Sequence, residues 1–422
     1  STSAELFEIA TGQLRDDNGN WAGYAPIGGH DFDDLSHNGF GKVGDGDRLG
    51  VNISWDISES INLSAAYGKN EDDYFIFADF DASPTFGFHT PGARITEDET
   101  TEIRLSGTTD RFDWSLGATQ VELSSKTHGG YYDGKSLPFF SFWFPDIRRP
   151  TTAYGMIEAD TTGIYGSIDY RLTDNLTVIA EIRNQEDEVN DPKVNAAAGK
   201  TISPGTFKST LPRVVVKYQI SDNSMVYFNY SKGTLPGGFN PEVADKLTTA
   251  EQIAVFNADT PGIGETFSEE TLKNYELGWK KMSDDGRLAM NLAVFRMERS
   301  DQVYSGFGTI PADVTCGGDN DGDGVPNVEI CTVAFSGNGT SSDIDGFEAE
   351  LSFQANDNLN LQAALGYTKA EISEFPDGGD CGDYNDVFGA GLSCQGQQAA
   401  RYPEWVGSLI ATYNFESGFG DS

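Results

Sequence analysis

The sequence predicts an all-β protein, a transmembrane antiparallel β-barrel, from three observations. Apolar and polar residues alternate over long segments such as 49–57, where the odd positions are Leu, Val, Ile, Trp and Ile. These segments are joined alternately by a short polar turn and by a loop of dozens of residues, which is typical of outer-membrane barrels. No run approaches the eighteen or so apolar residues of a membrane-spanning helix. A soluble β-sandwich is the alternative, but its strands are shorter and its loops do not sort into short and long.

Composition agrees with a barrel. Only 38% of the 422 residues are hydrophobic, as expected when every second strand residue faces a polar lumen instead of lipid. The 49 glycines, 17 tyrosines and 27 phenylalanines suit tight strand packing and aromatic girdles at the membrane interfaces.

The predicted strands follow one another in a regular order. They are residues 5–15, 48–57, 61–69, 100–109, 111–124, 161–172, 176–188, 206–220, 225–232, 265–282, 287–300, 332–354, 359–372 and 401–415. Turns rich in Asp, Asn and Gly at 174–175, 222–223, 284–286 and 356–358 are expected on the periplasmic side. The long segments 70–98, 126–160, 233–264, 301–331 and 373–399 are then expected to be extracellular.

The net charge of −38, from 66 acidic and 28 basic residues, excludes a general affinity for nucleic acid. The acidic residues concentrate in the long loops, where they either keep the loops soluble or gather cations at a pore mouth.

Four cysteines form two close pairs, Cys316 with Cys331 and Cys381 with Cys394, each within one long loop. Sequential disulfides are the simplest pairing, and they fit an oxidising compartment. A zinc site is the alternative, but the CxxC spacing and nearby histidines that it needs are missing.

Five segments resemble, in order, the barrel domain of TonB-dependent outer-membrane receptors. They are residues 225–240, with a KGxxxGGFN pattern, 267–280, with NYELGWK, 292–303, 345–351 and 402–405. In residues 275–280 the pattern predicts that Tyr275, Leu277 and Trp279 face lipid and that Glu276, Gly278 and Lys280 face the lumen. Gly237 and Gly238 are expected to allow a turn with positive φ.

The resemblance implies a receptor of the bacterial outer membrane, surrounded by outer-membrane lipid, monomeric and not an enzyme. Such receptors import scarce nutrients with energy relayed by the TonB-ExbB-ExbD complex to a plug domain. A ferric siderophore is the first expectation for the ligand, and a glycan or cobalamin are alternatives. A passive porin and a calcium-stabilised adhesion protein are the rival interpretations.

Such a receptor barrel has 22 strands and a plugged lumen. This chain shows about fourteen strands and neither a plug nor a closing aromatic strand. We therefore expect residues 1–422 to be a partial barrel domain from the interior of a longer protein.

Two loop features are candidate binding sites. An aromatic and basic run in one long loop suits an aromatic, glycan or anionic iron chelate, although it equally suits packing on the barrel rim. Its residues are Phe139, Phe140, Phe142, Trp143, Phe144, Arg148 and Arg149, and Phe239 of the KGxxxGGFN pattern is added to the same ligand-binding set.

Asp319, Asp321 and Asp323 have the spacing of a calcium loop, with Gly324 at the turn. The twelfth position is Ile330 instead of Glu, so the site would be non-standard. An acidic turn held by Cys316 and Cys331 is the alternative. Apart from this structural calcium, the sequence indicates no cofactor, and it contains neither GxSxG nor HExxH.

Overall fold

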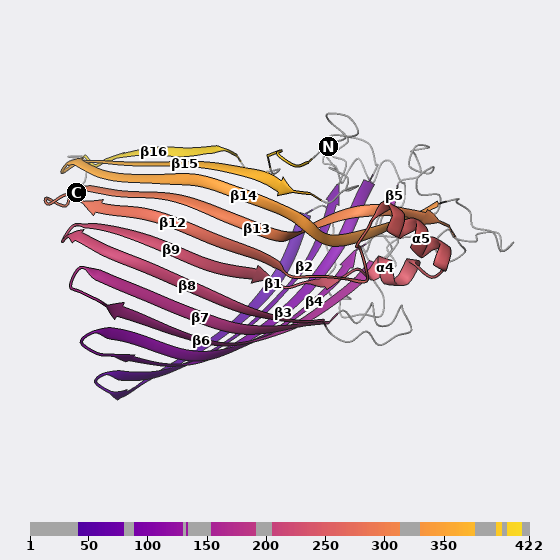
Figure 1. The fold of residues 1–422 in the computed structure, drawn as a ribbon, viewed down its shortest axis with the longest axis horizontal. Coiled ribbons are helices and arrows are strands. Elements are labelled where there is room, and N and C mark those ends of the chain that lie inside the picture. Colours follow the sequence, from indigo (N-terminus) through magenta and orange to yellow (C-terminus); the bar gives the residue numbers. More distant parts are fainter. Residues whose placement is uncertain are drawn as a thin grey trace, which may run out of the picture.

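A computed structural model describes residues 41–79, 88–129, 132–133, 153–190, 205–312, 330–375, 394–398 and 403–415. Nearly all of them belong to one antiparallel sheet of 14 strands (Figure 1). Its path runs β1-β2-β3-β4-β6-β7-β8-β9-β12-β13-β14-β15-β16, and β5 pairs with β3 off this path. Each strand on the path pairs with the path strands that precede and follow it along the chain, as in a meandering barrel wall.

The strand bounds follow the predicted alternation closely. They are β1 (Gly41–Ser58), β2 (Ile61–Asp79), β3 (Phe88–Thr108), β4 (Phe112–Gly129), β5 (Tyr132–Asp133), β6 (Ala153–Arg171), β7 (Leu176–Asn190), β8 (Gly205–Ser221), β9 (Ser224–Leu235), β12 (Glu270–Met282), β13 (Leu288–Pro311), β14 (Ile330–Asn356), β15 (Leu359–Glu374) and β16 (Trp405–Tyr413). The predicted strand 5–15 lies outside the described residues.

Several strands extend into segments that the sequence predicted as loops. β2 and β3 stay paired as far as Asp79 and His89, well inside the predicted loop 70–98. β13 is 24 residues long and continues to Pro311, well past its predicted end at residue 300, where it pairs with Ile330 of β14. β14 itself is 27 residues long and begins two residues before its predicted start. The two strands of a hairpin can stay paired beyond the apolar band, because pairing satisfies the backbone N–H and C=O groups that face each other there.

The sheet curves into an open trough, with short turns at one end and the two helices at the other (Figure 1). β1 and β16 form its two edges and do not pair with each other. The wall described here is therefore not closed. The helices are α4 (Pro241–Lys246) and α5 (Ala250–Asp259). Neither is long and apolar enough to cross a membrane.

One face of the sheet is apolar and exposed. Leu49, Ile164, Leu277 and Leu409 are 58%, 64%, 55% and 77% exposed, and the strand register places them on a common face, which we call the outward face. The concave face carries mainly polar side chains, and we call it the lumenal face. This division confirms the predicted alternation of Leu277 with Glu276 and Gly278.

Candidate functional site

The lumenal face is lined by polar side chains that bridge between strands. Tyr165 of β6 reaches across β4 and donates a hydrogen bond of 2.6 Å to Glu102 of β3. Gly117 of β4 leaves the room for this ring, since a Cβ there would lie 2.4 Å from the Tyr165 Cζ. The strand register places Glu102, Gly117 and Tyr165 on the face opposite the exposed Ile103 and Ile164, so these residues face the inside of the trough.

A second group of lumenal residues centres on Asp187, which is 4% exposed. Its carboxylate accepts hydrogen bonds from Thr161 at 2.7 Å and Gln185 at 3.0 Å. Arg183 in turn donates to Gln185 at 2.8 Å and to Thr119 at 2.9 Å. These residues form one connected set of donors and acceptors that faces the lumen.

The same arrangement recurs farther along the wall. Tyr227 of β9 lies across Gly278 of β12, where a Cβ would be 2.2 Å from the ring, and donates to Glu276. Arg213 pairs with Glu181 at 3.0 Å. The lumenal wall thus presents hydroxyl, amide and paired charged groups to a polar solute.

Residues 236–269, which connect β9 to β12, form a compact insert against the long ends of β13 and β14. They contain α4, α5 and a two-stranded sheet of β10 (Gly238–Phe239) and β11 (Thr266–Phe267). The sequence predicted a loop over 233–264 and one strand over 265–282, so the two helices and the separation of β11 from β12 are corrections. Gly237 and Gly238 do not have the expected positive φ. They are needed for close approach instead, because a Cβ on Gly237 would lie 2.2 Å from the Phe267 carbonyl oxygen.

The insert encloses the hydrophobic core of the described residues. The core comprises Val243, Phe256, Ile263, Ile310, Cys331, Val333 and Phe335. Phe256 is completely buried and meets Phe335 edge to face, with ring centroids 5.9 Å apart. This packing holds α5 against β13 and β14.

Side chains of α4 and of its N-cap residue, Asn240, form hydrogen bonds with backbone groups along one edge of β14. Asn240, which is 2% exposed, donates to the Ser336 carbonyl oxygen at 2.7 Å and accepts from the Ser336 N–H at 2.7 Å. Glu242 accepts from the Ala334 N–H at 2.7 Å, and Lys246 donates to the Thr332 carbonyl oxygen at 2.9 Å. Pairing of this kind satisfies a strand edge that would otherwise be open.

Two β-bulges mark the place where the insert meets the wall. The β13–β14 register shifts between Arg299 and Gln302 and again between Gln302 and Tyr304. Asp301 has φ +54° and Gly339 φ +119°. Two shifts reverse the alternation on each strand once, so the insert packs on the continuation of the lumenal face.

Glu270 is the first residue of β12 and lies next to these bulges. Its side chain is 8% exposed and forms an ion pair with Arg299, with a second contact of 2.9 Å to Nη2. The same carboxylate accepts from the Val303 N–H at 3.1 Å. Glu270 therefore satisfies a backbone group of β13 beyond the end of β12.

Of the predicted ligand-binding residues, the structure describes Phe239. It is half-buried beside the start of β8, where a Cβ on Gly205 would lie 3.4 Å from Phe239 and 3.0 Å from Phe207. Phe267 pairs with Gly238 in the small sheet. Phe207, Phe239 and Phe267 thus gather at the edge of the insert. No sequence pattern indicated Phe207 or Phe267 as part of this group.

The other predicted ligand-binding residues, Phe139 to Phe144, Arg148 and Arg149, lie outside the described residues, so they stay a prediction. The same holds for the predicted calcium ligands Asp319, Asp321 and Asp323. Cys331 and Cys394 are each in a disulfide, whereas Cys316 and Cys381 lie outside the described residues. Among the residues that are described, no group of three or more His, Cys, Asp or Glu side chains has the arrangement of a metal site.

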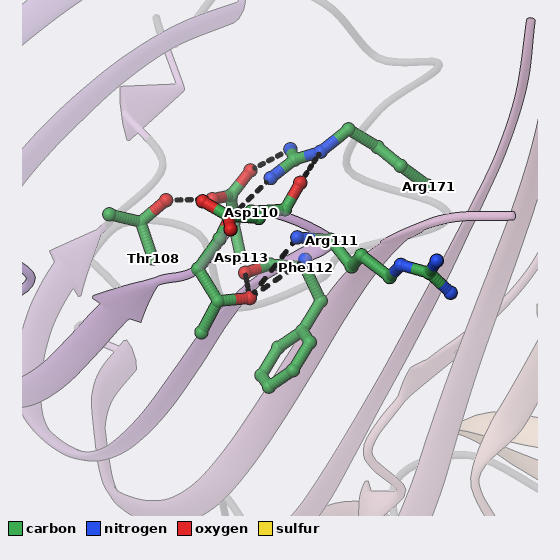
Figure 2. A network of polar contacts seen from close by, with 7 residues as sticks. Thr108, Asp110, Arg111, Phe112, Asp113 and Arg171 are labelled. Atoms are coloured by element: carbon green, nitrogen blue, oxygen red, sulfur yellow. Dashed lines mark hydrogen bonds and ion pairs between the residues drawn. The ribbon is translucent and has the colours of Figure 1, made fainter. Parts of the chain in front are cut away.

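At the opposite end of the wall, each short turn is linked to the next. Arg171, beside one turn, donates to Asp113 at 2.7 Å and to the carbonyl oxygens of Thr109 and Asp110 at 2.7 and 3.3 Å (Figure 2). Thr108 donates to the other oxygen of the Asp113 carboxylate. We call this series of linked turns the turn rim.

The turn rim continues along the wall in the same way. Asn175 donates to the Gln219 carbonyl oxygen at 3.1 Å, and Asn223 donates to Asp284 at 3.2 Å. Arg287 donates to the Gln354 carbonyl oxygen at 2.9 Å. These hydrogen bonds explain how the short turns stay aligned with one another along a wall without a solid core.

Comparison with known proteins connects this geometry to a family. Residues 3–421 match the family described as TonB dependent receptor-like, beta-barrel. A curated relative, the metal-pseudopaline receptor CntO of Pseudomonas aeruginosa, is 21% identical over 341 residues, which cover 73% of this chain and 40% of that protein.

Solved structures share the fold at low identity. The ferric yersiniabactin uptake receptor FyuA from Yersinia pestis has a TM-score of 0.60 at 14% identity, covering 89% of this chain and 48% of its own. The ferric preacinetobactin receptor BauA from Acinetobacter baumannii has a TM-score of 0.57 at 15% identity, covering 89% and 50%. The copper transporter OprC has a TM-score of 0.52 at 13% identity, covering 79% and 48%. The chain spans about half the length of these proteins or less.

Proposed function

This chain belongs to the TonB-dependent receptor β-barrel family, whose members are outer-membrane proteins, and we propose that the whole protein imports a ferric siderophore into the periplasm. The feature that carries this proposal is the wall itself, with a polar lumenal lining and a structured insert that packs on the lumenal side at the loop end. A polar solute entering from outside would meet the insert and then the lumenal side chains.

The choice of a metal chelate rests on what the related proteins are named for. FyuA and BauA are named for ferric siderophores, CntO for metal-pseudopaline and OprC for copper. Iron is the metal we propose first, and other chelated metals are the competing substrates. Import would be driven through TonB, ExbB and ExbD acting on a plug domain of the whole protein, which would act as a monomer.

Phe239 and its neighbour Phe207 are the described side chains that we assign to ligand contact. Both are half-buried, Phe239 on the insert and Phe207 on the adjoining wall, so part of each side chain stays accessible for contact with a chelate. Family members are receptors and transporters, so no chemical step is assigned to these residues.

Uptake of a radiolabelled ferric chelate tests the proposal in cells that produce the whole receptor. We expect uptake to require TonB and to stop when the proton gradient is collapsed. Uptake that survives this collapse would identify a passive channel instead. The same assay with copper and zinc chelates as competitors decides which metal complex is preferred.

The Phe239→Ala variant tests the ligand contact. We expect about tenfold weaker binding of the transported chelate, because a stacking contact contributes roughly 0.5–1.5 kcal/mol beyond its buried area. Phe307→Ala is the matched control, since Phe307 is 77% exposed on the β13 end. Equal binding by the two variants would remove Phe239 from the site.

A further inference from the structure

The outward face of the wall contains a hollow of about 720 Å³. It spans β3, β4, β6, β7 and β8, and its floor is Ala118. The register places Ile103 opposite Ala118 and Ala118 opposite Ile164. Ile103 and Ile164 are 56% and 64% exposed, so the hollow opens on the apolar outward side of the wall.

The lining of the hollow changes character along the strands. Its half nearer the short turns is apolar, with Ile103, Ala118 and Ile164. The half nearer the long loops has hydroxyl and amide groups, of which Thr101 and Thr162 lie two residues farther from the turns than the isoleucines. The hollow therefore crosses the boundary between the apolar band and the polar part of the wall.

The height of this boundary matches the outer surface of a membrane. On β6, residues 162–170 rise roughly 27 Å along the strand, or about 20 Å across a bilayer for a strand tilted by about 45°. The apolar band of outer-membrane barrels is about 25 Å tall. The polar half of the hollow thus lies where lipid headgroups of the outer leaflet meet their acyl chains.

Charges next to the hollow restrict the headgroup. Two residues farther from the turns, Glu99, Glu122, Asp160 and Glu188 stand opposite one another on four neighbouring strands. Lys69 of β2 pairs with Glu99 at 3.1 Å, which leaves an excess of carboxylates in this row. A carboxylate row at this distance disfavours a phosphate group. Lys208, a cation in the lining, is paired with Glu186 at 3.1 Å.

We propose that this hollow is a binding site for a glycolipid of the outer leaflet. Its acyl chain would lie on Ile103, Ala118 and Ile164, and its sugar hydroxyls would bond to Thr101 and Thr162. Uncharged hydroxyl groups both donate and accept hydrogen bonds, as the threonine side chains do. The site depends on the outer-membrane position of the wall and is independent of which chelate is imported.

The test measures the lipids retained by the full-length receptor after extraction in mild detergent, by mass spectrometry. Ala118→Trp fills the hollow, and we expect it to retain about tenfold less glycolipid per receptor, since about two methylene groups lose their protein contact. Ala180→Trp is the matched control, an outward-facing alanine of β7 outside the hollow, and should retain the wild-type amount.

A second variant keeps the shape of the hollow. Thr162→Val removes the hydroxyl group alone, and we expect a lower ratio of glycolipid to phospholipid on the receptor. Equal retention by the Ala118→Trp and Ala180→Trp variants would overturn the proposal. So would displacement by Ala118→Trp of a phosphate-headed phospholipid in place of the glycolipid. If Ala118→Trp does not fold, an unchanged lipid ratio in Thr162→Val also refutes the site.

Discussion

Removing the Asn240 side chain should release the insert from the wall. In the structure this amide makes three hydrogen bonds, at 2.8 Å to the Gly264 carbonyl oxygen and at 2.7 Å each to the Ser336 carbonyl oxygen and N–H. At about 1 kcal/mol for each bond, Asn240→Ala should lower the free energy of local opening by about 3 kcal/mol. Because 1.4 kcal/mol is tenfold, amides of α5 should exchange about 100-fold faster.

Hydrogen exchange followed by mass spectrometry on the whole receptor measures this opening directly. Peptides covering residues 250–259 report on the insert, and peptides from the β6–β7 hairpin serve as an internal reference. Asn229→Ala is the control variant, since Asn229 accepts one hydrogen bond of 3.3 Å from Arg213 on the lumenal wall. An increase of less than threefold in α5 exchange for Asn240→Ala would refute the argument that this amide holds the insert.

Three further changes test other parts of the molecule. Gly308→Ala would place a Cβ 2.5 Å from the Phe256 Cε2. We therefore expect the insert to lose about 1–3 kcal/mol of stability, measured by hydrogen exchange, and Phe256→Leu to restore part of it. No loss would show that the Phe256 ring can move aside. Arg171→Ala should speed exchange at the Thr109 turn, while wild-type exchange there would mean that the turn rim is held by backbone contacts alone. The Ser283 hydroxyl, followed by a backbone hydrogen bond from Arg287, holds the pKa of Asp285 below its ordinary value of 3.8. This carboxylate therefore stabilises the turn at pH values above 3.8, and the stabilisation is lost as the pH falls through the lowered pKa. Asp285→Asn should accordingly weaken the turn at neutral pH and leave it unchanged in strong acid. An acid titration of the turn amides followed by NMR measures this difference.

The wall was predictable because its signal is local. A period of two, as in residues 49–57, requires only neighbouring residues, and the short turns carry their own Asp, Asn and Gly. The length of β13 was not predictable, since its outer end beyond residue 300 contains polar and glycine residues that a membrane strand would not favour. The strand predicted at 332–354, by contrast, differs from β14 by only two residues at each end, and the outer ends of the two strands pair with each other. Those ends are stabilised by the insert, whose contacts with Ser336 come from 96 residues away.

Part of the insert did carry a local signal. Thr249 and Gln252 have the spacing of a capping box, and the structure confirms both of its bonds at the start of α5. Pro241 likewise stands in the first turn of α4. The aromatic group of Phe207, Phe239 and Phe267 had no such signal, because the three residues come from separate segments that meet only after the insert has packed.

The attachment of the insert to β14 has a consequence for the order of assembly. Each hairpin of the wall can join an edge that the preceding hairpin has already completed, which keeps most contacts close in sequence. Residues 236–269 are made before β14, yet Asn240, Glu242 and Lys246 find their partners only on that strand. The insert must therefore wait unpaired while β12, β13 and β14 form, and its closure is expected as a late and separate step of folding.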